Sequence, residues 1–254
     1  MVRSVYAGDA WGSNGHGILA PMSSQVRAMF ASIASRYDHG NQVLSLGLHH
    51  RWRRATVKAS GAKPGDRVLD CATGTGDLAF EFQRAVGRQG RVLGIDFCAE
   101  MLDVARAKAE REGLPAQFEE ADALELPHTS GSFDIASVAF GIRNVDDPGL
   151  GISEMARVVR PGGNVVVLEF GQPGGALFGP IYRFYSAHVI PRIGGWLTGK
   201  RYAYEYFHRT SSEFPCGAAF VALMENTERF SSVRLKRLTG GIAYVYIGTV
   251  GEPA

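Results

Sequence analysis

The feature that most constrains the fold of this chain is a regular alternation of strand-like and helix-like patterns between residues 67 and 170. The strand-like runs are RVLD at 67–70, RVLGID at 91–96, QFEE at 117–120, FDIASVAF at 133–140 and NVVVLEF at 164–170. Helical spacing of apolar residues occurs between them, at 77–86, 101–111 and 148–159. This alternation predicts an α/β fold, with a mostly parallel sheet covered by helices on both faces. A helix at 218–229 and strands at 233–236 and 242–247 bring the predicted sheet to seven strands.

Three segments lie outside the alternation. Residues 1–20 combine glycines with polar residues and show no apolar period, which predicts a flexible tail. Residues 21–60 show helical spacing that YDHGN at 37–41 interrupts, so we expect an N-terminal preface of two helices that forms a lid. Residues 171–215 hold 10 of the 26 aromatic residues, and we expect a helical insertion there, after the fifth strand. Residues 21–254, with 45% hydrophobic residues in the whole chain, should form one domain.

Charge and cysteine content exclude several classes of function. A net charge of +2 is too small to indicate a nucleic-acid partner. The three cysteines, Cys71, Cys98 and Cys216, form neither an even disulfide set nor a zinc-binding spacing, so we expect no metal and a reducing compartment. The chain has no apolar run of the roughly 18 residues that a membrane span needs. A cytoplasmic protein is therefore expected.

The run DCATGTGD at 70–77 lies where a strand meets a helix. Gly74 and Gly76 leave the backbone bare there, so a flat or anionic ligand could approach its amide groups. The spacing of Gly74, Gly76 and Ala79 also fits the loose dinucleotide pattern of nicotinamide enzymes. Asp96 follows Gly76 by 20 residues and could accept from ribose hydroxyls of either cofactor. The glycines and Asp96 therefore do not distinguish the two cofactors.

Two further acidic residues favour S-adenosylmethionine over a dinucleotide. The Asp70 carboxylate, at the strand tip, suits the ammonium group of a methionine moiety better than a pyrophosphate. Asp122, beside Ala123 in ADALELP at 121–127, could accept from an adenine amino group. Each residue has a purely structural alternative, because Asp70 and Asp77 could cap the loop and the helix and Asp122 could cap a turn. The combination nevertheless predicts a methyl-donor site.

Several longer stretches resemble one family. They are VRAMFASIASRYDHGNQVLSLGLHHRWRR at 26–54, LDCATGTGD at 69–77, AFGIRNVDD at 139–147, EMARVVRPGG at 154–163, LEF at 168–170, YRFYSAHVIPRIG at 182–194 and LTGGIA at 238–243. Together they resemble the ubiquinone/menaquinone biosynthesis C-methyltransferases. RYDHGN, SLGLHHRW, FGIRNV and HVIPRIG are specific to that family, whereas LDCATGTGD, LEF and the PGG turn are similar to many methyltransferases.

The resemblance implies a Rossmann-like class I methyltransferase fold and S-adenosylmethionine as cofactor. It implies that Thr75, Asp96, Asp122 and Ala123 contact the cofactor. The implied reaction is methyl transfer to a ring carbon of a lipophilic, polyprenylated quinol, either a demethylmenaquinol or a benzoquinol. Family members often have serine where this chain has Ala139, so one cofactor hydrogen bond would be missing at that contact. The stretch AYEYFHRTSSEFP at 203–215 is also a looser match, which leaves the tail and head group of the substrate open.

The chemistry of such a transfer indicates which side chains to look for. A sulfonium methyl is already activated, so the protein must align the acceptor and make it nucleophilic, without a metal. A quinol hydroxyl resembles a phenol with a pKa near 10, and its ionisation at pH 7 costs about 4 kcal/mol. Groups that take the proton or stabilise the phenolate should therefore lie near the methyl group.

Four residues are candidates for that role. Arg143 and Asn144 follow a predicted strand and should project from the carboxyl edge of the sheet, where ligands bind in open α/β folds. Tyr37 and His49 lie in and after the break between the two preface helices. Glu169 is a further pocket candidate. The alternatives are that Arg143 pairs with Asp146 or Asp147 at a helix start, that Tyr37 belongs to the core and that His49 is a satisfied or solvated histidine. For Glu169 the alternative is pairing with a local arginine.

The predicted insertion carries a net charge of +3 among its aromatic residues. Such a surface could cover a prenyl tail and contact anionic lipid at the inner face of the membrane, or it could form a homodimer interface. Three other functions stay open at this point. They are a methyltransferase for another aromatic or lipid metabolite, a non-catalytic cofactor-binding subunit and a dehydrogenase.

Overall fold

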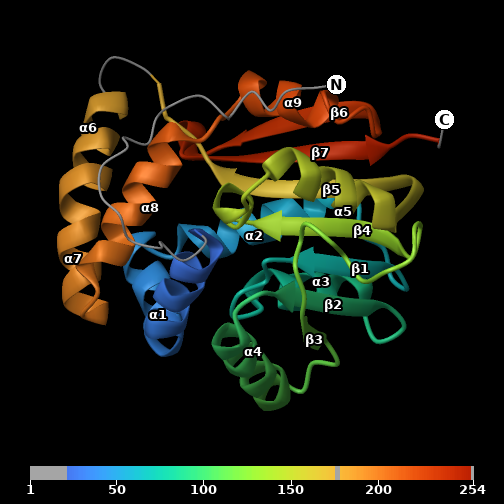
Figure 1. Ribbon diagram of the computed structural model, residues 1–254, viewed down its shortest axis with the longest axis horizontal. Coiled ribbons are helices and arrows are strands. Elements are labelled where there is room, and N and C mark those ends of the chain that lie inside the picture. The colour runs from blue at the N-terminus through green and yellow to red at the C-terminus, as the bar shows by residue number, and fades with distance from the viewer. Residues whose placement is uncertain (1–21, 175–177, 253–254) are drawn as a thin grey trace, which may run out of the picture.

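The computed structural model describes residues 22–174 and 178–252, and the predicted tail at 1–20 lies outside them. Within the described residues, seven strands form one sheet in the order β3-β2-β1-β4-β5-β7-β6 (Figure 1). The strands are β1 Arg67–Cys71, β2 Arg91–Asp96, β3 Gln117–Glu120, β4 Phe133–Ala139, β5 Val159–Phe170, β6 Phe230–Leu238 and β7 Ala243–Val250. Strands β1 to β5 pair in parallel, and β7 is antiparallel to both β5 and β6. The predicted seven-stranded, mostly parallel sheet is confirmed.

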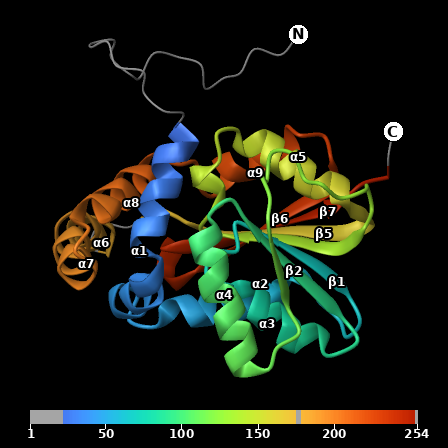
Figure 2. The same cartoon turned by 60° about the horizontal axis from the view of Figure 1, so that its bottom comes forward.

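Helices cover both faces of the sheet because each presents one apolar side to it. They include α3 Asp77–Val86, α4 Ala99–Glu112, α5 Pro148–Val158 and α9 Ala218–Glu225. Phe82 and Val86 of α3 join a buried cluster with Val166 of β5 on one face. Met155 of α5 and Phe220 of α9 belong to the cluster on the other face. Figure 2 shows α2, α3 and α4 on one side of the sheet and α5 and α9 on the other.

The two N-terminal helices are α1 Met22–Leu44 and α2 Leu48–Ser60, and the expected break at YDHGN is wrong. Helix α1 runs through residues 37–41, since a single glycine in a helix costs only about 1 kcal/mol and tertiary contacts outweigh it. The chain turns instead at Leu46 and Gly47, whose φ values of 51° and 73° lie in the left-handed region. Asp38 therefore projects from within a continuous helix.

The insertion after β5 is helical, as expected. It contains α6 Phe178–Phe184, a π-helical turn η2 Tyr185–Val189, α7 Ile190–Thr198 and α8 Arg201–Glu213. A third buried cluster joins α1 to this insertion and to α4 through residues such as Ile33, Met101 and Ile190. The Tyr185 hydroxyl also donates to the Leu44 carbonyl across 2.9 Å. Helix α1 thus lies between α4 and the insertion (Figure 2).

None of the described helices is long and apolar enough to cross a membrane.

Candidate functional site

Two cavities adjoin at the carboxyl ends of the parallel strands, with volumes of about 320 and 390 Å³. Phe30, Tyr37 and Phe140 line both cavities, so the two cavities are direct neighbours. The smaller cavity lies where the chain order reverses between β1 and β4, which is the usual binding position in open α/β sheets. The larger cavity lies between this edge and the helices α1, α2 and α8.

The smaller cavity contains most of the predicted cofactor residues. Its lining includes five of them: Gly74, Asp96, Asp122, Ala123 and Ala139. Asn144, predicted as a catalytic residue, also lines this cavity. Sequence reasoning missed other lining residues because they carry no distinctive chemistry: Ala72, Phe97, Met101, Leu124, Gly141 and Val145.

The two loop glycines serve different purposes. Gly74 has φ 56°, and a Cβ added there would meet nothing within 4 Å, so its backbone faces open space in the cavity. Gly76 has φ 84° and precedes α3, and a Cβ there would lie 2.9 Å from the Phe80 ring and 3.0 Å from Phe118. Gly74 therefore leaves room for a ligand, whereas Gly76 is required by packing and by its backbone angle.

Asp96 is held at the end of β2 by backbone amides. Its Oδ2 accepts from Gly74 N–H at 2.8 Å and its Oδ1 from Cys98 N–H at 3.0 Å. Burial raises the pKa of Asp96, and hydrogen bonds from the amides of Cys98, Gly74 and Phe97 oppose that rise. A carboxylate has about four acceptor sites, so at least one remains for a ribose hydroxyl.

Asp122 lies in the loop that follows β3. Its Oδ1 accepts from Leu124 N–H at 2.9 Å, so the residue does cap a turn, and it lines the cavity as well. Its Oδ2 accepts no hydrogen bond from any residue that the structure describes. Ala123 and Ala139 contribute only backbone polar groups and small apolar side chains to the lining.

Asp70 and Thr75 face into the protein instead of lining the cavity. Asp70 is 1% exposed, and its two oxygens accept from the hydroxyls of Thr73 and Ser137, each at 2.7 Å. Burial raises the pKa of Asp70 to about 6 against those two hydrogen bonds. The Thr75 hydroxyl donates to Asp38 Oδ1 at 2.5 Å. The predicted contacts of these two residues with the cofactor stay predictions. Their observed hydrogen-bond partners hold the loop on the side away from the cavity.

A largely buried ion network connects α1 and α2 to the loop at 70–77, and no motif in the sequence indicated it. Lys108 of α4 contacts Asp38 Oδ2 at 2.7 Å and Asp77 Oδ1 at 2.5 Å. Asp77 Oδ2 lies 3.3 Å from Arg53 Nη1 of α2. Burial alone would raise the pKa of Asp77, but Arg53 and Lys108 hold it below its usual value. Residues from four separate helices thus fix the loop that begins α3.

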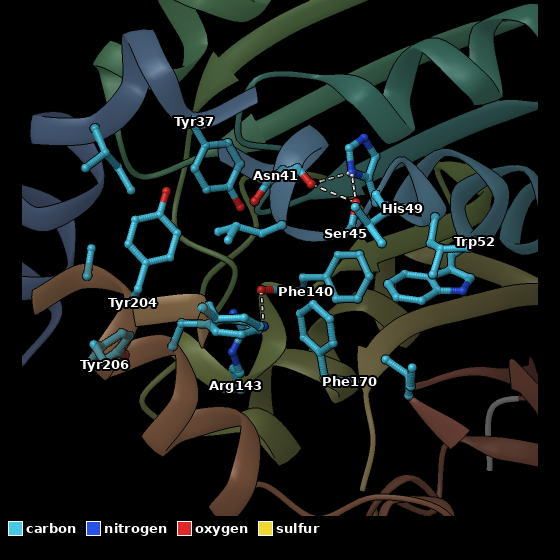
Figure 3. Close-up of a pocket in the computed structure, with 18 of the residues that line it drawn as sticks. Tyr37, Asn41, Ser45, His49, Trp52, Phe140, Arg143, Phe170, Tyr204 and Tyr206 are labelled. Atoms are coloured by element: carbon cyan, nitrogen blue, oxygen red, sulfur yellow. Dashed lines mark hydrogen bonds between the residues drawn. The ribbon is translucent and has the colours of Figure 1, made fainter. Parts of the chain in front are cut away.

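The larger cavity has a mostly apolar lining. Its walls include Met29, Ile33, Leu44, Leu48, Trp52, Phe140, Phe170, Tyr182, Tyr185, Ile190, Tyr204, Tyr206, Phe207 and Ile242. Besides the tyrosines, the lining contains five residues with polar side chains: Asn41, Ser45, His49, Arg53 and Arg143. Figure 3 shows Arg143 and Tyr206 on one side of this cavity, with Tyr37, Asn41, Ser45 and His49 on the other.

Arg143 is a buried cation whose position is fixed on several sides. Its Nη1 donates to the Phe140 carbonyl and, at 2.9 Å, to Glu169 Oε1, and its guanidinium lies 5.5 Å from the Phe170 ring centroid and 5.4 Å from that of Phe207. Its Nε has no hydrogen-bond partner among the described residues. Burial raises the pKa of Glu169, and Arg143 opposes that rise. Arg143 is therefore paired with Glu169, as the alternative for Glu169 held, and not with Asp146 or Asp147, and it still lines the cavity.

Asn144 and Tyr37 connect the two cavities. Asn144 follows Arg143 in the short helical turn η1 Ile142–Asn144, lines the smaller cavity and accepts at Oδ1 from the Tyr206 hydroxyl of α8 at 3.2 Å. Tyr37 lines both cavities and packs edge-to-face on Phe30, with centroids 6.2 Å apart. The residues predicted separately from the N-terminal region and from β4 are thus brought together.

His49 is 5% exposed and both of its ring nitrogens are engaged. Nδ1 lies 2.7 Å from Ser45 Oγ and 3.2 Å from the Asn41 carbonyl, while Nε2 lies 2.9 Å from Nε2 of His50. Burial, with Arg53 and His50 nearby, lowers the pKa of His49 to about 4. The ring is therefore neutral at pH 7.

Residues 20–250 match the ubiE/COQ5 methyltransferase family. The chain belongs to this family. It is 54% identical over 231 residues to a protein named ubiquinone/menaquinone biosynthesis C-methyltransferase from Bdellovibrio bacteriovorus, with 91% of this chain and 98% of that one covered. It is 45% identical over 223 residues to a demethylmenaquinone methyltransferase from Deinococcus radiodurans, with 88% and 91% covered.

The fold comparison agrees with the family. An S-adenosylmethionine-dependent methyltransferase structure from Thermotoga maritima superposes with a TM-score of 0.63 at 18% identity, covering 87% of this chain and 98% of that one. At that identity the likeness concerns the fold. The fold, the enzyme class and the cofactor expected from the sequence are therefore confirmed: the chain is an S-adenosylmethionine-dependent methyltransferase with a Rossmann-like sheet.

Proposed function

We propose that this enzyme methylates a ring carbon of a polyprenylated quinol, with S-adenosylmethionine held in the smaller cavity and the quinol in the larger one. The observation that carries the proposal is the larger cavity itself, an apolar space of about 390 Å³ that adjoins the cofactor cavity and contains the buried guanidinium of Arg143. An aromatic ring with a prenyl tail matches the apolar walls, and its ionised hydroxyl matches the cation. The names of the two curated relatives support this substrate class.

The smaller cavity has the features that the cofactor needs. Gly74 leaves open space beside its backbone, Asp96 keeps an acceptor site for a ribose hydroxyl, and Asp122 has an oxygen available for an adenine amino group. Ala123 and Ala139 would contact the cofactor through backbone and methyl groups. When bound, S-adenosylmethionine supplies a methyl group already activated by its sulfonium. The protein must then position the quinol and lower the cost of ionising it.

Arg143 lowers that cost by stabilising the phenolate. Because the arginine remains protonated at all relevant pH values, it acts as a fixed positive charge and not as a base. Glu169 and the Phe140 carbonyl hold the guanidinium in place before the substrate enters, so no reorganisation is needed at the moment of reaction. Arg143 lines the cavity, so its guanidinium lies beside the position proposed for the substrate oxygen.

The other candidates have complementary roles in this proposal. Tyr37, which lines both cavities, orients the ring beside the methyl group. Asn144, held by Tyr206, lines the junction on the cofactor side. His49 is a neutral imidazole at pH 7 and can accept the proton that the quinol loses.

An assay with a labelled methyl donor and reduced quinols tests the proposal. The substrates are a demethylated naphthoquinol and a polyprenyl benzoquinol, and each is assayed with the wild type and with Arg143→Ala. The control variant is Arg160→Ala, which removes a half-exposed arginine far from the cavities. We expect transfer to at least one quinol, a fall in kcat of about 100-fold in Arg143→Ala, and little change in the control. Unchanged calorimetric binding of S-adenosylmethionine would show that the variant is folded. Equal kcat values in all three proteins would refute the role of Arg143.

We further propose that the region around the larger cavity contacts the lipid surface that holds the substrate. Leu46 is 83% exposed, Phe184 62% and Trp196 84%, and Leu46 also lines the cavity. The exposed Arg183 and Arg192 lie on the same insertion. Exposed apolar and basic side chains together favour an anionic bilayer surface.

Sedimentation with phosphatidylglycerol vesicles tests this contact. The wild type should sediment with the vesicles, and the double variant Leu46→Ser, Trp196→Ser should not. Leu235→Ser, which removes a 43% exposed leucine from β6, is the matched control and should sediment like the wild type. Equal sedimentation of all three proteins would refute the proposal. It would also be refuted if the wild type bound no vesicles and the double variant lost a dimer that the wild type forms, because these side chains would then lie in a dimer interface.

A further inference from the structure

C-methylation of a quinol releases one proton for each turnover. The new C–C bond replaces a ring C–H bond, the C–S bond of the donor breaks with its electron pair left on sulfur, and the displaced hydrogen leaves as a proton. In the proposed site this proton arises inside a mostly apolar cavity, where an isolated charge is costly. The proton therefore needs a defined exit to water.

Among the described residues that line the cavity, His49 has a ring nitrogen that is unprotonated at pH 7 and can relay this proton. Arg53 and Arg143 are permanently protonated and cannot accept it. Burial raises the pKa of Tyr182, Tyr185 and Tyr206, so these three hydroxyls keep their own protons at neutral pH.

The groups around His49 form a continuous chain from the cavity to the surface. Ser45 lines the cavity, and its Oγ lies 2.7 Å from both His49 Nδ1 and the Asn41 carbonyl, so its hydroxyl proton can point to either acceptor. On the other side of the ring, His49 Nε2 lies 2.9 Å from Nε2 of His50, which is exposed to solvent. The two imidazole centroids are 3.9 Å apart. Figure 3 shows Ser45 and His49 joined at the edge of the cavity.

We propose that Ser45, His49 and His50 form the route by which the quinol proton leaves the cavity for solvent. The inference rests on the proposed quinol methylation. In the transfer, the quinol O–H bond breaks as its proton passes to Ser45 Oγ and the Ser45 proton passes to His49 Nδ1. The Nε2 proton of His49 then passes to His50 Nε2, and His50 releases its Nδ1 proton to water. After the methyl group bonds to the ring carbon, the hydrogen of that carbon leaves as a proton and is taken up by the phenolate oxygen, which restores the hydroxyl. One proton therefore leaves the cavity per turnover, no other reactant is needed, and each imidazole ring ends with one proton.

Two acceptors support the state that follows the transfer. The Asn41 carbonyl lies 3.2 Å from His49 Nδ1 and the Gln42 Oε1 lies 2.9 Å from His50 Nε2, so both ring N–H groups then have partners. The charged groups nearest to His49 are Arg53 on its own helix and Asp77 at the start of α3. Arg53 and burial outweigh Asp77 and lower the pKa of His49, so the ring passes a proton on and does not retain it.

Chemical rescue of His50→Ala tests the route. The side chain is exposed, so the variant should fold and bind S-adenosylmethionine like the wild type. We expect kcat for methyl transfer at pH 7, measured in the steady state, to fall about tenfold or more, within the range of proton-transfer catalysis, with KM for the quinol unchanged. Added imidazole should restore much of the rate by replacing the missing ring. His50→Gln, which keeps a polar side chain, should lose activity equally, and Arg51→Ala, an exposed neighbour on α2, should retain it.

The outcomes separate this inference from the proposed function. If the wild type methylates a quinol and His50→Ala does so at the same rate, the route is refuted while the proposed function stands. A loss of rate that imidazole does not restore, or that His50→Gln does not share, also refutes it, because a structural role would then explain the loss. If the wild type binds S-adenosylmethionine but methylates no quinol, both are refuted.

Discussion

Replacing Asp70 with asparagine should change how the stability of the enzyme depends on pH. Burial raises the pKa of this carboxyl from 3.8 to about 6, despite hydrogen bonds from Ser137 and Thr73. The folded protein therefore binds the proton more tightly than the unfolded chain does. Protonated Asp70 stabilises the fold fully below about pH 4, and this contribution is lost as the pH rises through 6. A difference of about two pKa units corresponds to about 3 kcal/mol.

Urea unfolding at several pH values measures the effect. Asparagine has nearly the same shape and does not titrate, so a change in its hydrogen bonds adds only a constant offset. The free energy of unfolding of the wild type, minus that of Asp70→Asn, should fall by about 2 kcal/mol between pH 4 and pH 8, the larger part of the full difference. Subtracting the two proteins cancels the titration of all other groups.

Asp134→Asn is the matched control with the opposite sign. Burial alone would raise the pKa of Asp134, but hydrogen bonds from Arg160 and Arg67 hold it below its usual value. The wild type should therefore gain stability relative to this variant as the pH rises. A difference for Asp70→Asn that does not vary with pH, or that varies in the same direction as for Asp134→Asn, would show that the reasoning about burial is wrong.

Three further predictions concern the loop and the buried ions. Gly74→Ala should lower the free energy of unfolding by only about 1 kcal/mol but weaken the binding of S-adenosylmethionine measured by calorimetry. Gly76→Ala should lower the free energy of unfolding by about 2 kcal/mol or more, because its Cβ would overlap an aromatic ring. Equal effects of the two alanines on stability would contradict this distinction. Lys108→Met, which removes the cation between two carboxylates, should lower the free energy of unfolding in urea by about 3 kcal/mol; an unchanged midpoint would show that the network is not stabilising. Glu169→Gln should cost a similar amount and lower kcat, since it leaves Arg143 buried without a counter-charge, and a variant with normal kcat would argue against preorganisation of that arginine.

Periodicity predicted the sheet well because its signal is local. The alternation from 67 to 170 located β1 to β5, and α3 and β2 begin and end at the expected residues. Errors arose where local signals compete with tertiary contacts. Gly40 and its neighbours suggested a break, yet contacts of Asp38 with Thr75 in the loop before α3 and with Lys108 of α4 favour a continuous α1.

The residues of the candidate site likewise fall into those that the sequence could locate and those whose contacts it could not predict. The positions of Gly74 and Asp96 follow from strand ends, which a motif can locate. The direction in which Asp70 and Thr75 point depends on partners such as Ser137 and Asp38, which are 67 and 37 residues away in the sequence. The pairing of Arg143 with Glu169 likewise depends on two neighbouring strands ending side by side. No spacing pattern encodes such contacts.

The central claim is that the two adjoining cavities bring an activated methyl group to a quinol ring carbon. The most direct test is to supply S-adenosylmethionine with a ¹³C-labelled methyl group together with a reduced demethylated quinol, and to locate the label in the product by NMR. The account predicts a methyl signal bonded to ring carbon, in a yield that depends on Arg143. Label in a methoxy group, or no incorporation by protein that binds the donor normally, would contradict it.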